Sequence, residues 1–243
     1  MYSLICALAA AAVSFALVAN LTRPAYAFLP AFAILAGVYW LLARRHSKAV
    51  EELMVELQRE IQQRRIPNAI KMLVGAYPHA KWVFLLRGQI DGQIGTLYFI
   101  DKDFEAALPL LEQAWVKHWP AKGMLASYWF WHHKPDKALE ILDKTISANK
   151  KEAMLYGLKA FMQVKLKDAD GARASLVAGK EQCPSAVPIS ENLRRLQNGE
   201  KLRMSDFGEQ WWQFHLEKPS MNQAMKMAGT TGKPKGGKKA MYR

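Results

Sequence analysis

The sequence predicts an all-α protein: an α-solenoid of about four helix pairs that follows a two-helix transmembrane hairpin. Three observations lead to this fold class. Two long stretches near the N-terminus carry no charge, apolar residues then recur at three- and four-residue spacing, and an alanine recurs at positions 69, 107, 138 and 172. Spacing of three and four residues marks one face of a helix, and a recurrence of about 34 residues is typical of stacked helix pairs.

The apolar N-terminus predicts the hairpin. Residues 2–19 and 25–43 contain no charged side chain, and each stretch approaches the roughly 20 residues needed to cross about 30 Å of hydrocarbon. We therefore expect spans at about 2–20 and 25–43, within a hairpin domain at 1–46. Small residues four apart, Ala12 with Ala16 and Ala33 with Gly37, are expected to let the two helices approach closely.

A signal peptide cleaved after Ala27 is the competing interpretation. The hairpin is favoured because no Lys or Arg precedes the first apolar stretch and a second apolar stretch follows at once. Arg44, Arg45 and Lys48 come directly after the second stretch, whereas the turn carries only Arg23. Positive residues stay on the cytoplasmic side. We expect an integral protein of a bacterial-type inner membrane with its C-terminal domain in the cytoplasm.

The helix pairs are expected over residues 47–186. The segment from Ile94 to Ala114 reads as helix, turn, helix, with Gly95 and Ala107 where two helices touch closely. Ile94, Gly95 and Tyr98 on the first helix, and Ala107, Leu111 and Ala114 on the second, resemble the tetratricopeptide repeat (TPR) pattern. Weaker matches occur on either side, and the recurring alanines are 38, 31 and 34 residues apart. The resemblance implies stacked pairs that share one core.

The resemblance also implies a concave groove, lined by the first helix of each pair, in which peptides or partner helices dock. The run Tyr128–Trp131 supports such a surface, because four consecutive aromatics on a helix cannot all face one core. Filling core remains an equal alternative for most of these aromatics. The groove candidates are Thr96, Phe99, Ser127, Phe130, Trp131 and Phe161.

Residues 187–218 are expected to form C-terminal capping helices. Ser190 is predicted to cap a helix that Gly199 ends, and Phe207, Trp211 and Phe214 share one face of a second helix that would cover the open end of the array. An exposed partner-binding helix is the alternative. Residues 219–243 are expected to be a basic, disordered tail, rich in Gly, Lys and Met. Its cations are Lys226, Lys233, Lys235, Lys238, Lys239 and Arg243.

Catalytic chemistry is not expected. The six histidines lack an HExxH pattern or a cysteine companion, so no metal site is predicted. The glycines at 229 and 232 lack the spacing and the hydroxyl of a phosphate-binding loop, and no cofactor is expected. The two cysteines, Cys6 and Cys183, are far apart in the sequence, which is compatible with a reducing compartment.

These patterns favour a membrane-anchored scaffold or adaptor that mediates protein–protein interaction at the cytoplasmic membrane face, including the role of an accessory subunit of a membrane assembly. The net charge of +13 keeps an alternative open. Through its basic tail the chain would tether nucleic acid or a ribosome, or bind anionic lipid.

Overall fold

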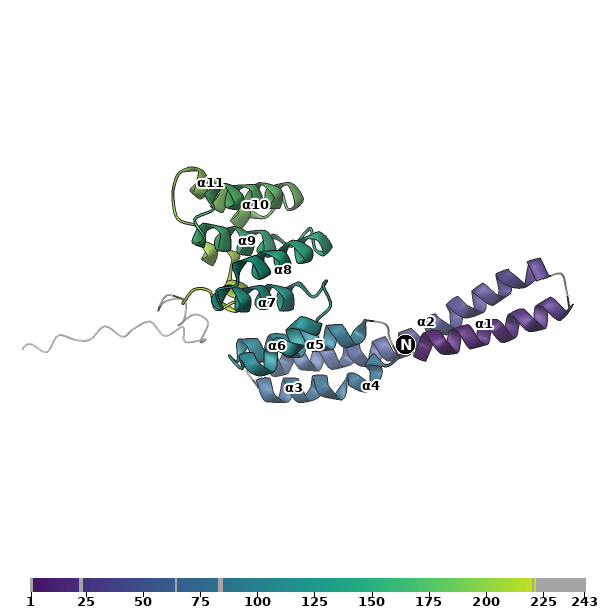
Figure 1. Ribbon diagram of the computed structural model, residues 1–243. Helices are drawn as coiled ribbons and strands as arrows, with labels where there is room; N and C mark the ends of the chain where they lie inside the picture. Colours follow the sequence, from purple (N-terminus) through teal and green to yellow (C-terminus); the bar gives the residue numbers. More distant parts are fainter. Residues whose placement is uncertain (1, 22–23, 64, 83–84, 220, 222–243) are drawn as a thin grey trace, which may run out of the picture. The chain divides into compact units, whose positions relative to one another are not determined.

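The computed structural model describes residues 2–21, 24–63, 65–82, 85–219 and 221, and the regular structure in these residues is helical (Figure 1). The chain divides into two compact units, residues 1–149 and 150–243. The first contains α1 (Tyr2–Leu21), α2 (Pro24–Gln62), α3 (Ile66–Gly75), α4 (Tyr77–Ala80), α5 (Leu86–Ile100), α6 (Phe104–Gln113), α7 (Trp119–Trp131) and α8 (Pro135–Ala148). The second contains α9 (Ala153–Lys165), α10 (Ala169–Gln182), α11 (Val187–Gln197), the 3₁₀ helix η1 (Met204–Phe207) and α12 (Glu209–Trp212).

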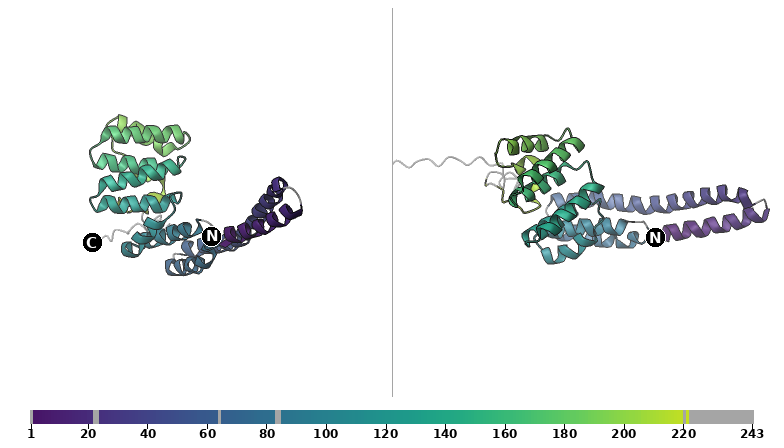
Figure 2. Two further views of the ribbon diagram at one scale, coloured as in Figure 1. Left: turned by 45° about the vertical axis from the view of Figure 1, so that its right-hand side comes forward. Right: turned by 45° about the horizontal axis from the view of Figure 1, so that its top comes forward.

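Helices α1 and α2 lie side by side as an antiparallel hairpin, as both views of Figure 2 show. The rings of Phe15 and Phe28 are 5.0 Å apart across it. The small residues buried in the hairpin are Ala7, Ala11, Ala27 and Ala31. They keep the predicted four-residue spacing, but the predicted pairs are wrong. Ala12, Ala16, Ala33 and Gly37 are exposed, because the packed stripes lie on other faces of the two helices.

Among the described residues, one helix is long and apolar enough to cross a membrane, at Tyr2–Asn20. The second apolar stretch, Tyr26–Leu42, has 17 residues, which corresponds to about 26 Å of helix. It is thus shorter than the predicted second span. Large apolar side chains cover the outside of the hairpin, among them Ile5, Phe28, Leu29 and Phe32.

No break in the helix marks the predicted boundary at residue 46, because α2 runs continuously from Pro24 to Gln62. The second apolar stretch and the first helix of the first predicted pair are therefore one rod. Residues 43–62 contain neither Gly nor Pro, so nothing in this sequence interrupts the helical hydrogen bonds. In the C-terminal part of that rod, Leu57 packs in a core with Leu73 of α3 and Ile90 of α5.

The remaining helices form sequential pairs, namely α5 with α6, α7 with α8, and α9 with α10. Each first helix ends in the same turn. Lys102, His133 and Lys167 adopt positive φ angles of 69°, 55° and 64°. The following residue donates its N–H to the carbonyl five positions earlier, from Asp103 to Tyr98, Lys134 to Trp129 and Asp168 to Gln163. This six-to-one bond, with a left-handed residue before the donor, is a Schellman turn.

The same six-to-one bond recurs beyond these pairs. Arg65 donates to Glu60 at the end of α2, and Glu200 donates to Arg195 after α11, where Gly199 has a φ of 71°. The five donors lie at 65, 103, 134, 168 and 200, at intervals of 38, 31, 34 and 32 residues. After each of the first four donors, a fully buried alanine follows four residues later. The recurring alanine therefore marks a recurring backbone turn.

The C-terminal helices begin and break at other places than predicted. Helix α11 starts at Val187, three residues before Ser190, because Pro188 is compatible with the first turn of a helix. Its predicted end near Gly199 is confirmed. The predicted second helix is divided into η1 and α12 by Gly208, whose φ is 81°. That left-handed conformation interrupts the helical path.

Candidate protein-interaction surface

The predicted groove residues come from α5, α7 and α9, and four of the six are buried within the chain. Thr96 and Ser127 donate their hydroxyls to carbonyls of their own helices, Gly92 and Gly123, at 2.7 and 2.9 Å. Phe99 is fully buried and Phe161 nearly so. These four side chains offer no free surface to a ligand in this structure. Phe130 and Trp131 are half-buried and retain exposed area.

Trp131 belongs to an aromatic cluster that joins α5, α6 and α7. Its ring stacks on Phe99 at 6.2 Å and meets Phe104 edge-on at 5.5 Å, and Phe99 and Phe104 are 5.1 Å apart. Tyr128 continues the cluster from α7, 6.5 Å from Phe104. Such contacts add to packing beyond simple burial. Trp131 therefore has a structural role in addition to any binding role.

Trp129 projects from α7 toward α8 instead. Lys134 and Lys137 lie over its ring, with ammonium-to-centroid distances of 4.8 and 3.5 Å, and Lys137 also pairs with Glu112 at 3.7 Å. The indole Nε1 is buried and has no hydrogen-bond partner in the described part of the chain. The aromatic run thus divides between two packing roles, and Phe130 is the member that has no ring contact among the described residues.

In the second unit the C-terminal segment 204–217 covers α9. Trp211 is fully buried and meets Phe161 edge-on at 5.0 Å, and its Nε1 donates to Glu217 at 3.0 Å. The ring of Phe207 lies directly over Gly157, where a Cβ would come within 2.4 Å of the ring. Phe207 and Trp211 of the predicted aromatic face both contact α9. The face of α9 that they cover carries the groove candidate Phe161.

A polar joint positions α7 against α5 and α6. The Nδ1 of His118 accepts from the N–H of Ala121 at 3.3 Å and caps α7, while Nε2 is 3.2 Å from Oε1 of Gln93 on α5. Burial holds the pKa of His118 below 6.5, with a smaller contribution from Lys122. Lys122 donates to the carbonyls of Leu111 and Glu112, both at 2.9 Å, and so caps α6.

A second polar cluster lies at the base of the hairpin, and no sequence pattern identifies it. The hydroxyl of Tyr77 donates to Asp91 at 2.6 Å, and Nε of Arg87 is 3.8 Å from the same carboxylate. Burial, then the hydrogen bond to Asp91, raises the pKa of Tyr77 to about 12. Beside it, Tyr77, Ala80, Lys81 and Arg87 line a cavity of about 410 Å³.

Within the described part of the chain, no group of three or more His, Cys, Asp or Glu residues is arranged to hold a metal ion. The six tail cations, Lys226 to Arg243, lie outside the described residues. Comparison of the chain with protein-family models, with curated proteins and with solved structures finds no match.

Proposed function

We propose that this chain is a membrane-anchored scaffold whose TPR-like helix pairs hold a protein partner at the cytoplasmic membrane face. The observation that carries the proposal is the recurring Schellman turn with its buried alanine, at intervals of 38, 31, 34 and 32 residues. A helix pair that repeats in this way extends a binding surface along the chain rather than enclosing an active site.

The apolar hairpin supports the membrane part of the proposal. Large apolar side chains such as Leu29 and Phe32, at 78% and 70% exposure, face outward along both helices. In water such an exposed apolar surface would promote aggregation of a monomer, whereas in lipid its contacts with acyl chains are favourable. We propose that both helices enter the membrane, with the shorter Tyr26–Leu42 stretch accommodated by local thinning or by its flanking aromatics.

Phe130 is the proposed contact residue. It is half-buried, and its neighbours Trp129 and Trp131 are held by Lys137 and Phe99, so the surface around it is fixed before a partner arrives. A preorganised aromatic on a rigid helix is the kind of side chain that dominates binding energy at interfaces. An apolar or aromatic segment of the partner suits this surface.

Site-specific crosslinking tests the proposal. A photoreactive amino acid placed at residue 130 in intact cells should capture a discrete partner, and Phe130→Ser should weaken recovery of that partner by about five- to thirtyfold. Val177 on α10 provides the matched control, since it is apolar, helical and 40% exposed. The same crosslinked species at positions 130 and 177, or full recovery by Phe130→Ser, would contradict the proposal.

A further inference from the structure

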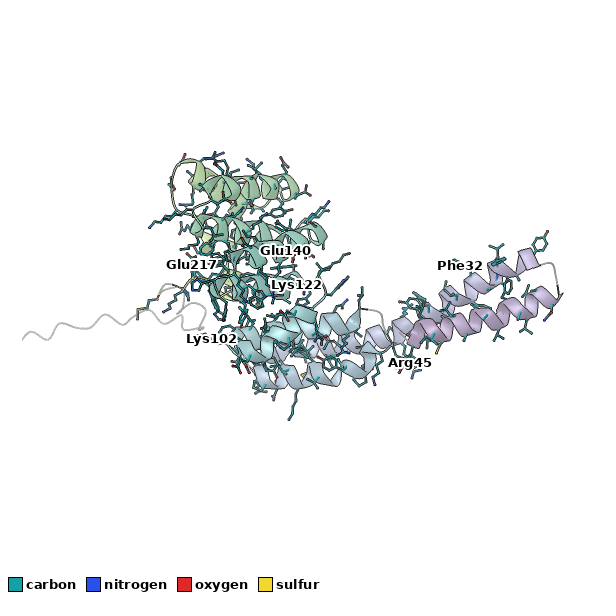
Figure 3. All side chains as sticks on the ribbon, viewed as in Figure 1. Phe32, Arg45, Lys102, Lys122, Glu140 and Glu217 are labelled. Atoms are coloured by element: carbon teal, nitrogen blue, oxygen red, sulfur yellow. The ribbon has the colours of Figure 1, made fainter. Side chains whose placement is uncertain are left out.

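The base of the hairpin gathers cations from segments far apart in the sequence. The rings of Phe15 on α1 and Phe28 on α2 are in contact. Tyr2 precedes Phe15 by thirteen residues, and Leu41 follows Phe28 by thirteen residues. Because the two helices are antiparallel, Tyr2 and Leu41 lie at the same level of the hairpin. Figure 3 shows Arg45 at this end of the hairpin and Phe32 farther along it. Arg44, Arg45 and Lys48, all exposed, therefore lie on α2 just beyond the level at which α1 starts.

The segment that follows α4 is hydrogen-bonded to the start of α1, at this same end of the hairpin. The N–H of Tyr2 donates to the carbonyl of Lys81 at 2.9 Å, the hydroxyl of Ser3 donates to the carbonyl of Trp82, and the rings of Tyr2 and Trp82 are 5.5 Å apart. The 410 Å³ cavity with Lys81 and Arg87 on its wall thus lies beside the end of the apolar span.

The surroundings of this cavity suit the boundary between lipid and water. Tyr2 and Trp40 are about half exposed at this level, where amphipathic aromatics prefer to lie. The guanidinium of Arg44 lies over the Trp40 ring at 4.8 Å, which directs a second cation along the same boundary. A headgroup next to the hairpin would meet this zone without leaving the bilayer.

The positively charged side chains on the cavity wall favour an anionic ligand. Arg87 has 74% of its side chain exposed, whereas Asp91 beneath it has 4% exposed. The Asp91 carboxylate accepts a hydrogen bond from the Tyr77 hydroxyl and lies 3.8 Å from Nε of Arg87, which offsets part of its negative charge. Arg87 approaches Asp91 through Nε, and a guanidinium carries further N–H donors whose planar geometry matches a phosphate.

We infer that the cavity of Tyr77, Ala80, Lys81 and Arg87 binds the phosphodiester headgroup of an anionic membrane lipid. Arg87 and Lys81 hold the phosphate, the Tyr77–Ala80 wall packs against the glycerol region, and the acyl chains lie along the outside of α1. Arg44, Arg45 and Lys48 add attraction to the same leaflet. This inference rests on the proposed membrane anchoring.

The test uses the full chain reconstituted in vesicles of phosphatidylcholine with or without phosphatidylglycerol, and native mass spectrometry counts the lipids that remain bound. The wild type should retain phosphatidylglycerol in preference to phosphatidylcholine. Lys81→Gln should reduce that preference about fivefold, and the double variant with Arg87→Gln about thirtyfold. Lys150→Gln/Lys151→Gln removes the same charge from the second unit and should leave the preference unchanged.

Arg87→Lys keeps a charge near Asp91 and serves as the folded variant if Arg87→Gln loses structure by circular dichroism. It should lose part of the preference, because a lysine cannot hold a phosphate through two parallel bonds. Equal retention of the two lipids by the wild type, or an unchanged preference in the Lys81→Gln and Arg87→Lys variants, would overturn the inference.

A separate arm distinguishes lipid from a free anion. Millimolar inorganic phosphate should not displace the bound phosphatidylglycerol, and displacement would show a soluble-anion site instead. Failure of the chain to remain with vesicles of either composition would contradict the membrane anchoring itself. Stable insertion without lipid preference would contradict only the headgroup site.

Discussion

The His118 side chain contacts both α5 and α7, and its cap on α7 depends on the ring being neutral. The neutral ring accepts the N–H of Ala121 at the start of α7, and protonation would remove that acceptor. The folded-state pKa lies below the unfolded value of 6.5 because the ring is buried. The stability that the neutral ring contributes is therefore present in full above about pH 6.5, and it is lost as the pH falls through the folded-state pKa.

Thermal unfolding of the full chain in detergent should consequently become easier between pH 7 and pH 5. His118→Asn keeps a capping oxygen without a titrating ring and should flatten this part of the profile, while His118→Ala should cost about 1 kcal/mol at pH 7. His133 is exposed, so His133→Asn is the matched control and should keep the wild-type profile. An identical pH dependence in wild type and His118→Asn would refute the capping role.

At the scale of elements, the C-terminal segment on α9 depends on a residue with no side chain. Phe207 occupies the space above Gly157, and Trp211 covers Phe161 beside it. The spacing of the aromatics indicated a shared face, but spacing alone does not say which surface that face will cover. The small residue at position 157 was the available signal, since Gly within a helix often permits a close approach.

Gly157→Leu should displace Phe207 and release the segment 204–217 from α9. Limited proteolysis of the full chain should then cut within 204–217 at least tenfold faster than in wild type, because cleavage follows local opening. Gly75→Ala is the control, since no described residue beyond its chain neighbours and its own helix backbone comes within 4 Å of a Cβ there, and it should leave the cleavage rate unchanged. Equal cleavage of the Gly157→Leu variant and wild type would show that Phe207 does not hold the segment.

Element prediction succeeded where a local pattern had one physical solution. The turn within Ile94–Ala114 and the buried alanines Ala107 and Ala138 were identified because a close helix pair requires small residues at fixed positions. The predicted domain boundary at residue 46 coincides with no helix break, for the opposite reason. A change from apolar to polar composition alters the surroundings of a helix, but only a residue such as Gly or Pro ends it.

The interaction surface was less predictable than the fold. Thr96, Phe99 and Phe161 lie on the expected helices, yet their side chains are buried by neighbours whose placement no single helix reveals. Similarly, Lys81 and Arg87 flank a cavity only because Tyr2 fastens the segment after α4 to the start of α1. Long-range contacts of this kind leave no periodic mark in the sequence.

At the scale of the whole molecule, two features are combined in one chain, an apolar hairpin and a series of helix pairs. A single rod, α2, belongs to both, since its first part pairs with α1 and its last part carries Leu57 into the core with α3 and α5. We propose that this shared helix connects the membrane anchor directly to the first helix pair, without an intervening flexible linker.

The intact mass of the protein after alkaline carbonate washing of membranes tests whether both apolar helices are held in lipid. The full chain should stay in the membrane pellet with its mass unshortened at the N-terminus, because two apolar helices held in lipid are not released by carbonate. A variant that lacks residues 2–43 should move to the supernatant. A pelleted or soluble product that begins after Ala27, or release of the uncleaved chain by carbonate, would contradict the account.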